Sequence, residues 1–264
     1  MKKFFALLLA ALLLVSCTLC LAETEIAPGL TGEVEEVADL PVQEVDDMPV
    51  VEDEPNNLPL AGVKIGIDPG HQAHANSQKE AVAPGSSEMK AKVSSGTAGV
   101  KTGIAEYVTV LEIAFKLKDA LEAQGAMVYM TRTSHDVDIS NQERAKMMND
   151  LGADLVLRIH CDGSNKSKTH GIGMYVTATG SIAAESYRAA QCLMPAMCAA
   201  TGAPEYGIYQ FDTYTGLNWS TVPCILVECG FMSNPDEDVL LNTPEYQQKL
   251  ADGMVAGIAD YMGR

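Results

Sequence analysis

The sequence is short of basic residues. It holds 18 Lys and Arg against 35 Asp and Glu in 264 residues, a formal net charge of -17. Nucleic-acid binding depends on clustered cations that neutralise phosphates, so this balance excludes nucleic acid as an expected partner. The chain also lacks internal repeats and a second folded module. Its length and its 47% hydrophobic content therefore predict one globular domain, which we expect to be a monomer.

Long apolar runs are also scarce. The run Phe4–Val15 follows the basic pair Lys2-Lys3 and is too short to span a bilayer comfortably as a mature helix. This pattern is typical of a secretory signal, which we assign to residues 1–22, and it predicts an exported protein of the cell envelope or the extracellular space. Two processing routes remain open. A lipobox-like Leu14-Val15-Ser16-Cys17 would leave Cys17 lipidated and tethered to the membrane, whereas cleavage after Cys20-Leu21-Ala22 would release a soluble protein.

Residues 23–59 contain twelve acidic side chains, no basic one and no aromatic one. Such a segment buries too little apolar surface to offset the entropy of ordering, so we expect a disordered, self-repelling linker. The folded domain is predicted to occupy residues 60–264.

Short apolar runs alternate with helical periodicity from Leu60 onwards. This alternation predicts the α/β class: a single domain with a central mixed, mostly parallel sheet flanked by helices. Expected strands cover residues 63–67, 126–131, 154–160, 173–178 and 222–228, and expected helices cover 105–124, 139–151, 181–200 and 244–262. We expect Pro195 to interrupt the third helix.

Two further expectations concern the polar segments. Residues 74–103 have no clear period and are predicted to form an inserted, lid-like loop. In the helix 139–151, Asn141, Glu143 and Arg144 are expected on the polar side.

Four polar residues stand where expected strands, turns or helices meet. His71 follows the first strand through Asp68-Pro69-Gly70, His160 and Glu228 end two buried strands, and Glu106 begins the first helix. Catalytic groups of open α/β sheets gather beyond the carboxyl ends of the strands. Two His and a carboxylate with an open position form the usual catalytic zinc shell, and a further carboxylate can take a proton from water. Spacing alone leaves the alternative that each His is a structural hydrogen-bonding residue.

Five ordered motifs carry a family resemblance. Ile67-Asp68-Pro69-Gly70-His71, Glu106 with Leu111, Met130-Thr131-Arg132, Arg158-Ile159-His160 and Leu226–Asn234 resemble the motifs of the zinc-dependent type-3 N-acetylmuramoyl-L-alanine amidases. The resemblance covers about residues 62–263. By that resemblance His71, Glu106 and His160 are the zinc ligands, and Glu228 is the catalytic glutamate.

The resemblance implies a substrate and a reaction. The partner is peptidoglycan, and the reaction is hydrolysis of the amide between N-acetylmuramic acid and L-alanine in an exposed, shallow cleft. Two alternatives stay open: another zinc peptidase of the wall, and a wall-binding protein without catalysis.

The chain departs from the family pattern around His160. Where the family often has Ser-Ile-His-Ala-Asn, this sequence reads Arg158-Ile159-His160-Cys161-Asp162. Strand alternation places Arg158 on the same face as His160, where it would contact substrate or pair with a carboxylate. Asp162 is either an acceptor that orients a metal ligand or a plain turn residue. We expect His74, His135 and His170 to lie outside the site.

The folded domain contains five cysteines: Cys161, Cys192, Cys198, Cys224 and Cys229. An odd number cannot all pair internally. Cys161 and Cys229 each follow a site residue, so alternation places them on the far face of the sheet. We expect buried free thiols, with a Cys161–Cys229 bridge as a minority alternative.

Overall fold

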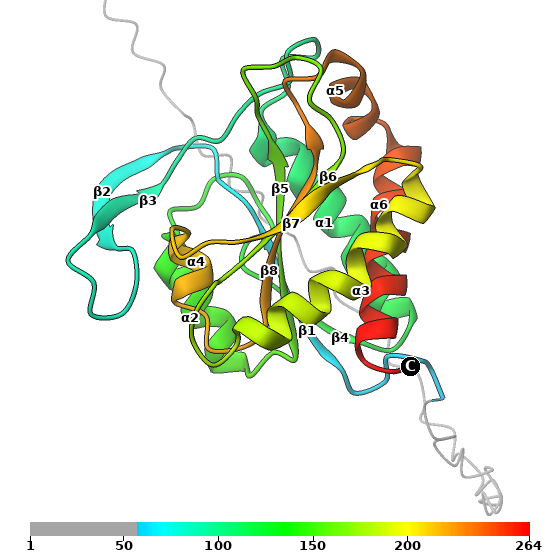
Figure 1. Cartoon of the computed structure of the whole chain (residues 1–264), viewed down its shortest axis with the longest axis horizontal. Coiled ribbons are helices and arrows are strands. Elements are labelled where there is room, and N and C mark those ends of the chain that lie inside the picture. The colour runs from blue at the N-terminus through cyan, green and yellow to red at the C-terminus, as the bar shows by residue number, and fades with distance from the viewer. Residues whose placement is uncertain (1–56) are drawn as a thin grey trace, which may run out of the picture. The chain divides into compact units, whose positions relative to one another are not determined.

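The computed structural model describes residues 57–264, which fold around a six-stranded sheet of order β4-β1-β5-β8-β6-β7 (Figure 1). The first four strands in that order are mutually parallel, whereas β6 runs antiparallel to β8 and parallel to β7. The predicted mixed, mostly parallel sheet is therefore confirmed. The strands are β1 (Lys64–Pro69), β4 (Met127–Met130), β5 (Leu155–Asp162), β6 (Ile172–Val176), β7 (Glu205–Gln210) and β8 (Cys224–Phe231).

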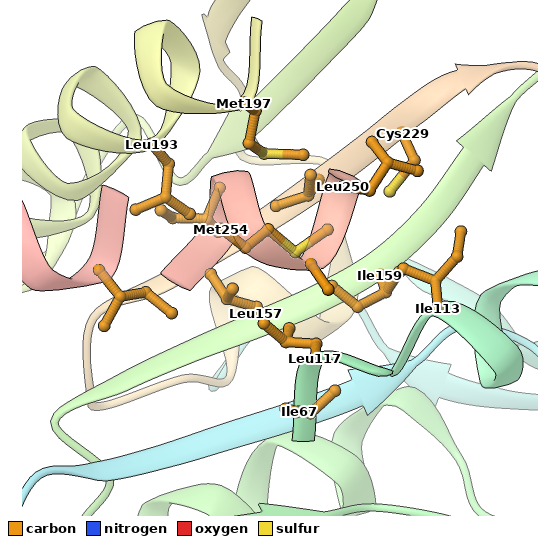
Figure 2. Packing of buried hydrophobic residues seen from close by; sticks show 14 of the residues in the cluster. Ile67, Ile113, Leu117, Leu157, Ile159, Leu193, Met197, Cys229, Leu250 and Met254 are labelled. Carbon is orange, nitrogen blue, oxygen red and sulfur yellow. The ribbon is translucent and has the colours of Figure 1, made fainter. Parts of the chain in front are cut away.

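One face of the sheet is covered by three long helices, α1 (Glu106–Ala123), α3 (Ala183–Thr201) and α6 (Pro244–Tyr261). Figure 2 shows Leu117, Leu193 and Met254 from these helices packed against the apolar side chains of the strands. The other face carries the shorter helices α2 (Asn141–Leu151) and α4 (Thr215–Asn218) over a smaller apolar cluster. Helix α5 (Pro235–Leu241) follows β8. We call these two sides the three-helix face and the open face.

The alternation of β5 shows how the sequence separates these two faces. Leu155, Leu157, Ile159 and Cys161 belong to the core of the three-helix face. Arg158, His160 and Asp162 alternate with these core residues and line a groove on the open face. Successive side chains of a strand point to opposite faces, so one strand supplies both the core and the site. Cys161 and Cys229 lie in the core as predicted, and the five cysteines of the described chain are unbridged.

The inserted segment after β1 is not the loop that we expected. It forms an antiparallel hairpin of β2 (Asn76–Ala81) and β3 (Met89–Val93), which projects from the sheet (Figure 1). Most of its side chains are exposed or half-buried. Without a buried face the strands have no apolar alternation, which is why periodicity missed them.

Two other expectations about elements were wrong. Helix α3 continues through Pro195. Pro195 and Gln191, four residues before it, are both exposed, so water can satisfy the carbonyl that proline leaves unpaired. Arg144 of α2 is not on a solvated side but is 1% exposed. Strand β7 and the short helices α4 and α5 were not predicted from the sequence.

The predicted signal at residues 1–22 and nearly all of the predicted acidic linker at 23–59 lie outside the described residues. Within residues 57–264 no helix is long and apolar enough to cross a bilayer.

Helices α3 and α6 approach closely where α6 presents two glycines. A Cβ added at Gly257 would lie 2.5 Å from Cα of Leu193, and one at Gly253 would lie 2.7 Å from Cα of Met197. Backbone atoms cannot turn aside as a flexible side chain does. The absence of a side chain at Gly253 and Gly257 therefore sets the spacing of the two helices.

We predict that Gly257→Ala lowers the free energy of unfolding by about 1–3 kcal/mol, because the added methyl overpacks the contact between helices. The matched control is Ala256→Gly at the neighbouring exposed position, where helix propensity alone costs about 1 kcal/mol. Urea denaturation measures both. Propensity favours alanine at either position, so a more stable Gly257→Ala protein would contradict the packing argument.

Candidate active site

Three side chains from separate elements meet at the carboxyl ends of β1 and β5. His71 follows β1, Glu106 is the first residue of α1, and His160 lies in β5. Oε1 of Glu106 is 3.2 Å from Nε2 of His71 and 3.1 Å from Nδ1 of His160. The structure therefore brings together the three residues predicted as metal ligands.

The backbone of His71 adopts a conformation that is rare for a residue with a side chain. Its φ is +57°, the only positive value outside glycine in the described chain. Nδ1 of its ring lies 2.9 Å from the carbonyl oxygen of Ser94. A carbonyl only accepts, so this contact places the proton on Nδ1 and leaves the lone pair of Nε2 facing Glu106. Strain and tautomer together prepare Nε2 for a metal ion.

The carboxylate of Glu106 is buried but well supplied with donors. Oε2 accepts from the backbone N–H of Thr97 at 2.9 Å, and Oε1 accepts from that of Cys161 at 3.1 Å. Burial alone would raise the pKa of Glu106, but contacts with His160 and His71 outweigh it and hold the pKa well below its ordinary value. Burial lowers the pKa of His160. Both shifts favour the deprotonated forms that bind metal.

Two glycines let the ligands approach one another. A side chain at Gly70 would collide with the ring of His160, and one at Gly96 would meet Glu106 and His71. Gly96 also has a φ of +76°. The backbone at Gly70 and Gly96 therefore packs directly against the three candidate ligands.

These residues fit a zinc ion. The donor atoms of His71, Glu106 and His160 all lie within 4.8 Å of one another. The two measured separations, 3.1 and 3.2 Å, are close to the roughly 3.3 Å expected between ligands of a tetrahedral ion with bonds of about 2.0 Å. In this geometry the histidine donor atoms are Nε2 of His71 and Nδ1 of His160.

Glu228 stands beside this group without joining it. It pairs with His160 across the β5–β8 ladder, so both side chains leave the sheet on the open face. Its Oε2 is buried without a hydrogen-bond partner in the described chain. Burial raises the pKa of Glu228, and the nearby carboxylates of Glu106 and Asp162 raise it further. A carboxylate with a raised pKa and a free oxygen is suited to accept a proton.

The site lies in an open groove of about 710 Å³. The β2–β3 hairpin forms one wall and contributes Lys79 and Lys90, while the segment of Tyr214 forms another. Backbone carbonyls of the hairpin accept from Asn141 of α2 and from Trp219 at the end of α4, at 2.7 and 2.8 Å. The hairpin is therefore a wall held against the domain at two places.

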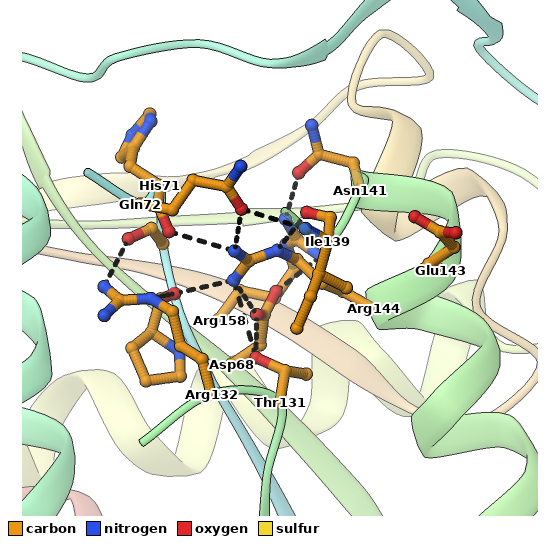
Figure 3. A network of polar contacts seen from close by, with 12 residues as sticks. Asp68, His71, Gln72, Thr131, Arg132, Ile139, Asn141, Glu143, Arg144 and Arg158 are labelled. Atoms are coloured by element: carbon orange, nitrogen blue, oxygen red, sulfur yellow. Dashed lines mark hydrogen bonds and ion pairs between the residues drawn. The ribbon is translucent and has the colours of Figure 1, made fainter. Parts of the chain in front are cut away.

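A buried ion-pair network supports the floor of the groove (Figure 3). Asp68 is 1% exposed, and its two oxygens lie 2.8 Å from Arg144 and 2.7 Å from Arg158. Arg144 also donates to the backbone oxygens of Pro69 and His71. The network thereby connects β1, α2 and β5 and holds the backbone that carries His71.

Arg158 pairs with the carboxylate of Asp68, which is one of the two alternatives considered for it, and its side chain also lines the groove. The side chain of Asp162 accepts from the N–H of Gly163, as a turn residue does, and neither histidine is among its hydrogen-bond partners. His74, His135 and His170 lie outside the metal-ligand group of the described chain. Sequence reasoning missed Ser94 and the carboxylate role of Asp68, because both depend on partners distant in sequence.

Comparison with known proteins gives one consistent result. Residues 65–260 match the family model described as N-acetylmuramoyl-L-alanine amidase. An N-acetylmuramoyl-L-alanine amidase of Mycobacterium tuberculosis is 31% identical over 216 residues, which cover 77% of this chain and 88% of that protein. The germination-specific amidase of Bacillus subtilis is 29% identical, covering 78% and 83%. The crystal structure of the amidase Ami1 from Mycobacterium smegmatis superposes with a TM-score of 0.72 at 28% identity, covering 77% and 98%.

We predict that Asp68→Asn lowers the free energy of unfolding at pH 7 by about 3–5 kcal/mol, because it leaves two buried guanidinium groups without their carboxylate. Burial alone would raise the pKa of Asp68, but Arg158 and Arg144 hold it far below its ordinary value of 3.8. The stability that Asp68 adds is thus complete above about pH 5 and declines as the pH falls below about 4.

Urea denaturation at pH 7 and pH 3 measures this effect as the difference between wild type and variant. Asp119→Asn, on the exposed side of α1, is the control and should change stability by less than about 0.5 kcal/mol. If the loss in free energy of unfolding caused by Asp68→Asn were the same at pH 7 and pH 3, the lowered pKa of Asp68 would be contradicted.

Proposed function

This chain belongs to the N-acetylmuramoyl-L-alanine amidase family, and from that premise we propose that it is an exported, zinc-dependent hydrolase of peptidoglycan. The bond cleaved is the amide between the lactyl group of N-acetylmuramic acid and L-alanine of the stem peptide. The observation that carries the proposal is the convergence of His71, Glu106 and His160 in an open groove. Beside them lies Glu228, whose buried Oε2 has no hydrogen-bond partner in the described chain.

His71, Glu106 and His160 would hold the zinc ion. When bound, zinc supplies a Lewis acid that polarises the scissile carbonyl and makes water more acidic. The residues around the ligands keep them ready for this task. Ser94 fixes the ring of His71, and the N–H groups of Thr97 and Cys161 orient Glu106.

Glu228 would act first as the general base and then as the general acid. Its free Oε2 accepts a proton from the attacking water while the new C–O bond forms at the carbonyl carbon. The same carboxyl group then donates a proton to the leaving nitrogen as the C–N bond breaks, which yields a free L-alanine amino terminus and a lactyl carboxylate. The raised pKa of Glu228 keeps both transfers accessible.

The groove itself supports a polymeric substrate. It is open to solvent along the sheet edge rather than enclosed, and its lining mixes apolar side chains with Lys79, Lys90 and Arg158. These cations suit a substrate that carries carboxylates. Export is proposed from the sequence of residues 1–22, and tethering through Cys17 remains one of its two routes.

Product analysis tests the reaction. Incubation of purified peptidoglycan with the full chain should release L-alanine amino termini while leaving the glycan strands intact. New D-amino-acid termini alone would instead identify a peptidase, and binding without any product would identify a wall-binding protein.

Four variants separate metal binding from proton transfer. We predict that His71→Ala, Glu106→Ala and His160→Ala each lose bound zinc and activity together. Glu228→Gln should retain zinc but lose activity about a hundredfold or more, because the general base is removed. Metal content by mass spectrometry and turnover on peptidoglycan are the two measurements.

His170→Ala is the matched control, because His170 is an exposed histidine that lies outside the groove lining and whose Nδ1 is 2.9 Å from the backbone oxygen of Lys168. It should keep both zinc and activity. Equal zinc loss in Glu228→Gln and in the three ligand variants would show that Glu228 is itself a ligand.

A further inference from the structure

Six aromatic side chains gather beside the groove on the open face of β6 and β7. Tyr175 of β6 lies opposite Tyr209 of β7 in the strand register, with ring centroids 5.4 Å apart. Phe211 follows two residues later, 6.2 Å from Tyr209 and 6.0 Å from Tyr175. Tyr206 and Tyr214 extend the group at its two ends, and Phe231 packs against Tyr206. We call Tyr206, Tyr209 and Phe211 with Tyr175 the aromatic row.

Three rings of the row share an orientation, whereas the plane of Tyr206 is tilted by 54° from that of Tyr209. The planes of Tyr209 and Phe211 differ by 14°, and that of Tyr175 is within 26° of both. A Cβ at Gly207 would meet the far end of the Tyr209 ring, whose hydroxyl donates to the carbonyl of Tyr206. The long axis of Tyr209 therefore runs along β7 rather than outward, which a glycine at position 207 permits.

The row is continuous with the catalytic groove. Gly173 of β6 pairs with Glu228 of β8. A Cβ at Gly173 would touch Tyr206 on one side and Glu228 on the other, at 3.5 and 3.6 Å. One residue without a side chain thus separates the row from the proposed general base, and Tyr214 at the other end of the group lines the groove directly.

The aromatic side chains of the group differ in burial. Tyr175 and Tyr214 pack against the apolar cluster under α2 and α4, so they contribute to the stability of the domain. Tyr206 and Phe211 are 41% and 44% exposed. Both contact the half-buried ring of Tyr209, which joins them into one surface. An apolar surface next to an active site typically marks a binding surface.

We propose that the aromatic row binds the saccharide side of the substrate, the glycan strand that carries the scissile amide. The proposal rests on the proposed function, since hydrolysis at Glu228 requires that a sugar lie next to it. N-acetylated pyranose rings are uncharged and present apolar C–H faces with a polar edge. The row offers a complementary surface that is aromatic and uncharged, with Tyr206 and Phe211 as its exposed members. The cations of the groove, Lys79, Lys90 and Arg158, are left for the carboxylates of the peptide.

Binding is tested with a ligand that has no amide to cleave. Tetra-N-acetylchitotetraose is titrated into the full chain and followed by calorimetry or NMR. We expect Phe211→Ala and Tyr206→Ala each to weaken its binding about three- to tenfold. Phe115→Ala is the matched control, because Phe115 is 39% exposed but lies on α1, which covers the opposite face of the sheet. It should bind as the wild type does, and thermal unfolding should show equal folding of all three variants.

A kinetic comparison gives a second measurement. With polymeric glycan as substrate, the two row variants should raise KM and leave kcat nearly unchanged. With a muramoyl peptide that has a single sugar, their KM should change much less than with the polymer.

Several outcomes would overturn the proposal. Chitotetraose binding that is absent in the wild type, or equal in wild type and row variants, would do so. The same holds if the exposed rings are needed only for self-association, seen as a dimer that Phe211→Ala dissociates without any effect on sugar binding. If the wild type hydrolyses no muramoyl amide at all, the proposed function fails instead, and the sugar titration distinguishes that result because it needs no catalysis.

Discussion

The end of β1 depends on one buried carboxylate. Asp68 neutralises Arg144 from α2 and Arg158 from β5 in a place where either cation alone would be costly. Arg144 passes this constraint to the backbone of Pro69 and His71, and Arg158 brings a fixed positive charge to the groove. One carboxylate thus holds two guanidinium groups beneath the proposed metal ligands and ties the backbone of His71 to α2 and β5.

Buried charge is also compensated by several neighbours at the proposed metal centre. Glu106 begins a helix, faces two histidines and receives two backbone N–H groups, so its negative charge is satisfied from four directions. Glu228, one strand away from His160, has a buried oxygen without a partner in the described chain. Two glutamates at the same sheet edge thus differ in proton affinity because of their neighbours, and this difference suits Glu106 to the proposed role of ligand and Glu228 to that of proton carrier.

Much of this arrangement could be read from the sequence, because it follows from strand periodicity. Alternation along residues 155–162 placed Arg158 and His160 on one face and Cys161 on the other. Strand ends indicated His71, His160 and Glu228 as candidate site residues, and the start of the first helix indicated Glu106. The partners of Asp68 and His71 could not be predicted, since Arg144 and Ser94 are distant in sequence and look like ordinary polar residues. The hairpin escaped detection because neither of its faces is buried, and Pro195 was overrated as a helix breaker because water reaches the freed carbonyl.

The base of the β2–β3 hairpin is connected directly to His71, the first of the proposed metal ligands. Asn76 pairs with Val93 at the base of the hairpin, and the next residue, Ser94, holds the ring of His71. A slip of one residue in β3 would present the carbonyl of Val93 or Ser95 to that ring in place of Ser94. The length of the hairpin can vary at its tip without effect on the ligand, whereas the register at its base cannot. Insertions and deletions should accordingly be tolerated around residues 83–88, which are exposed or half-buried, and there they would reshape a wall of the groove without moving Ser94.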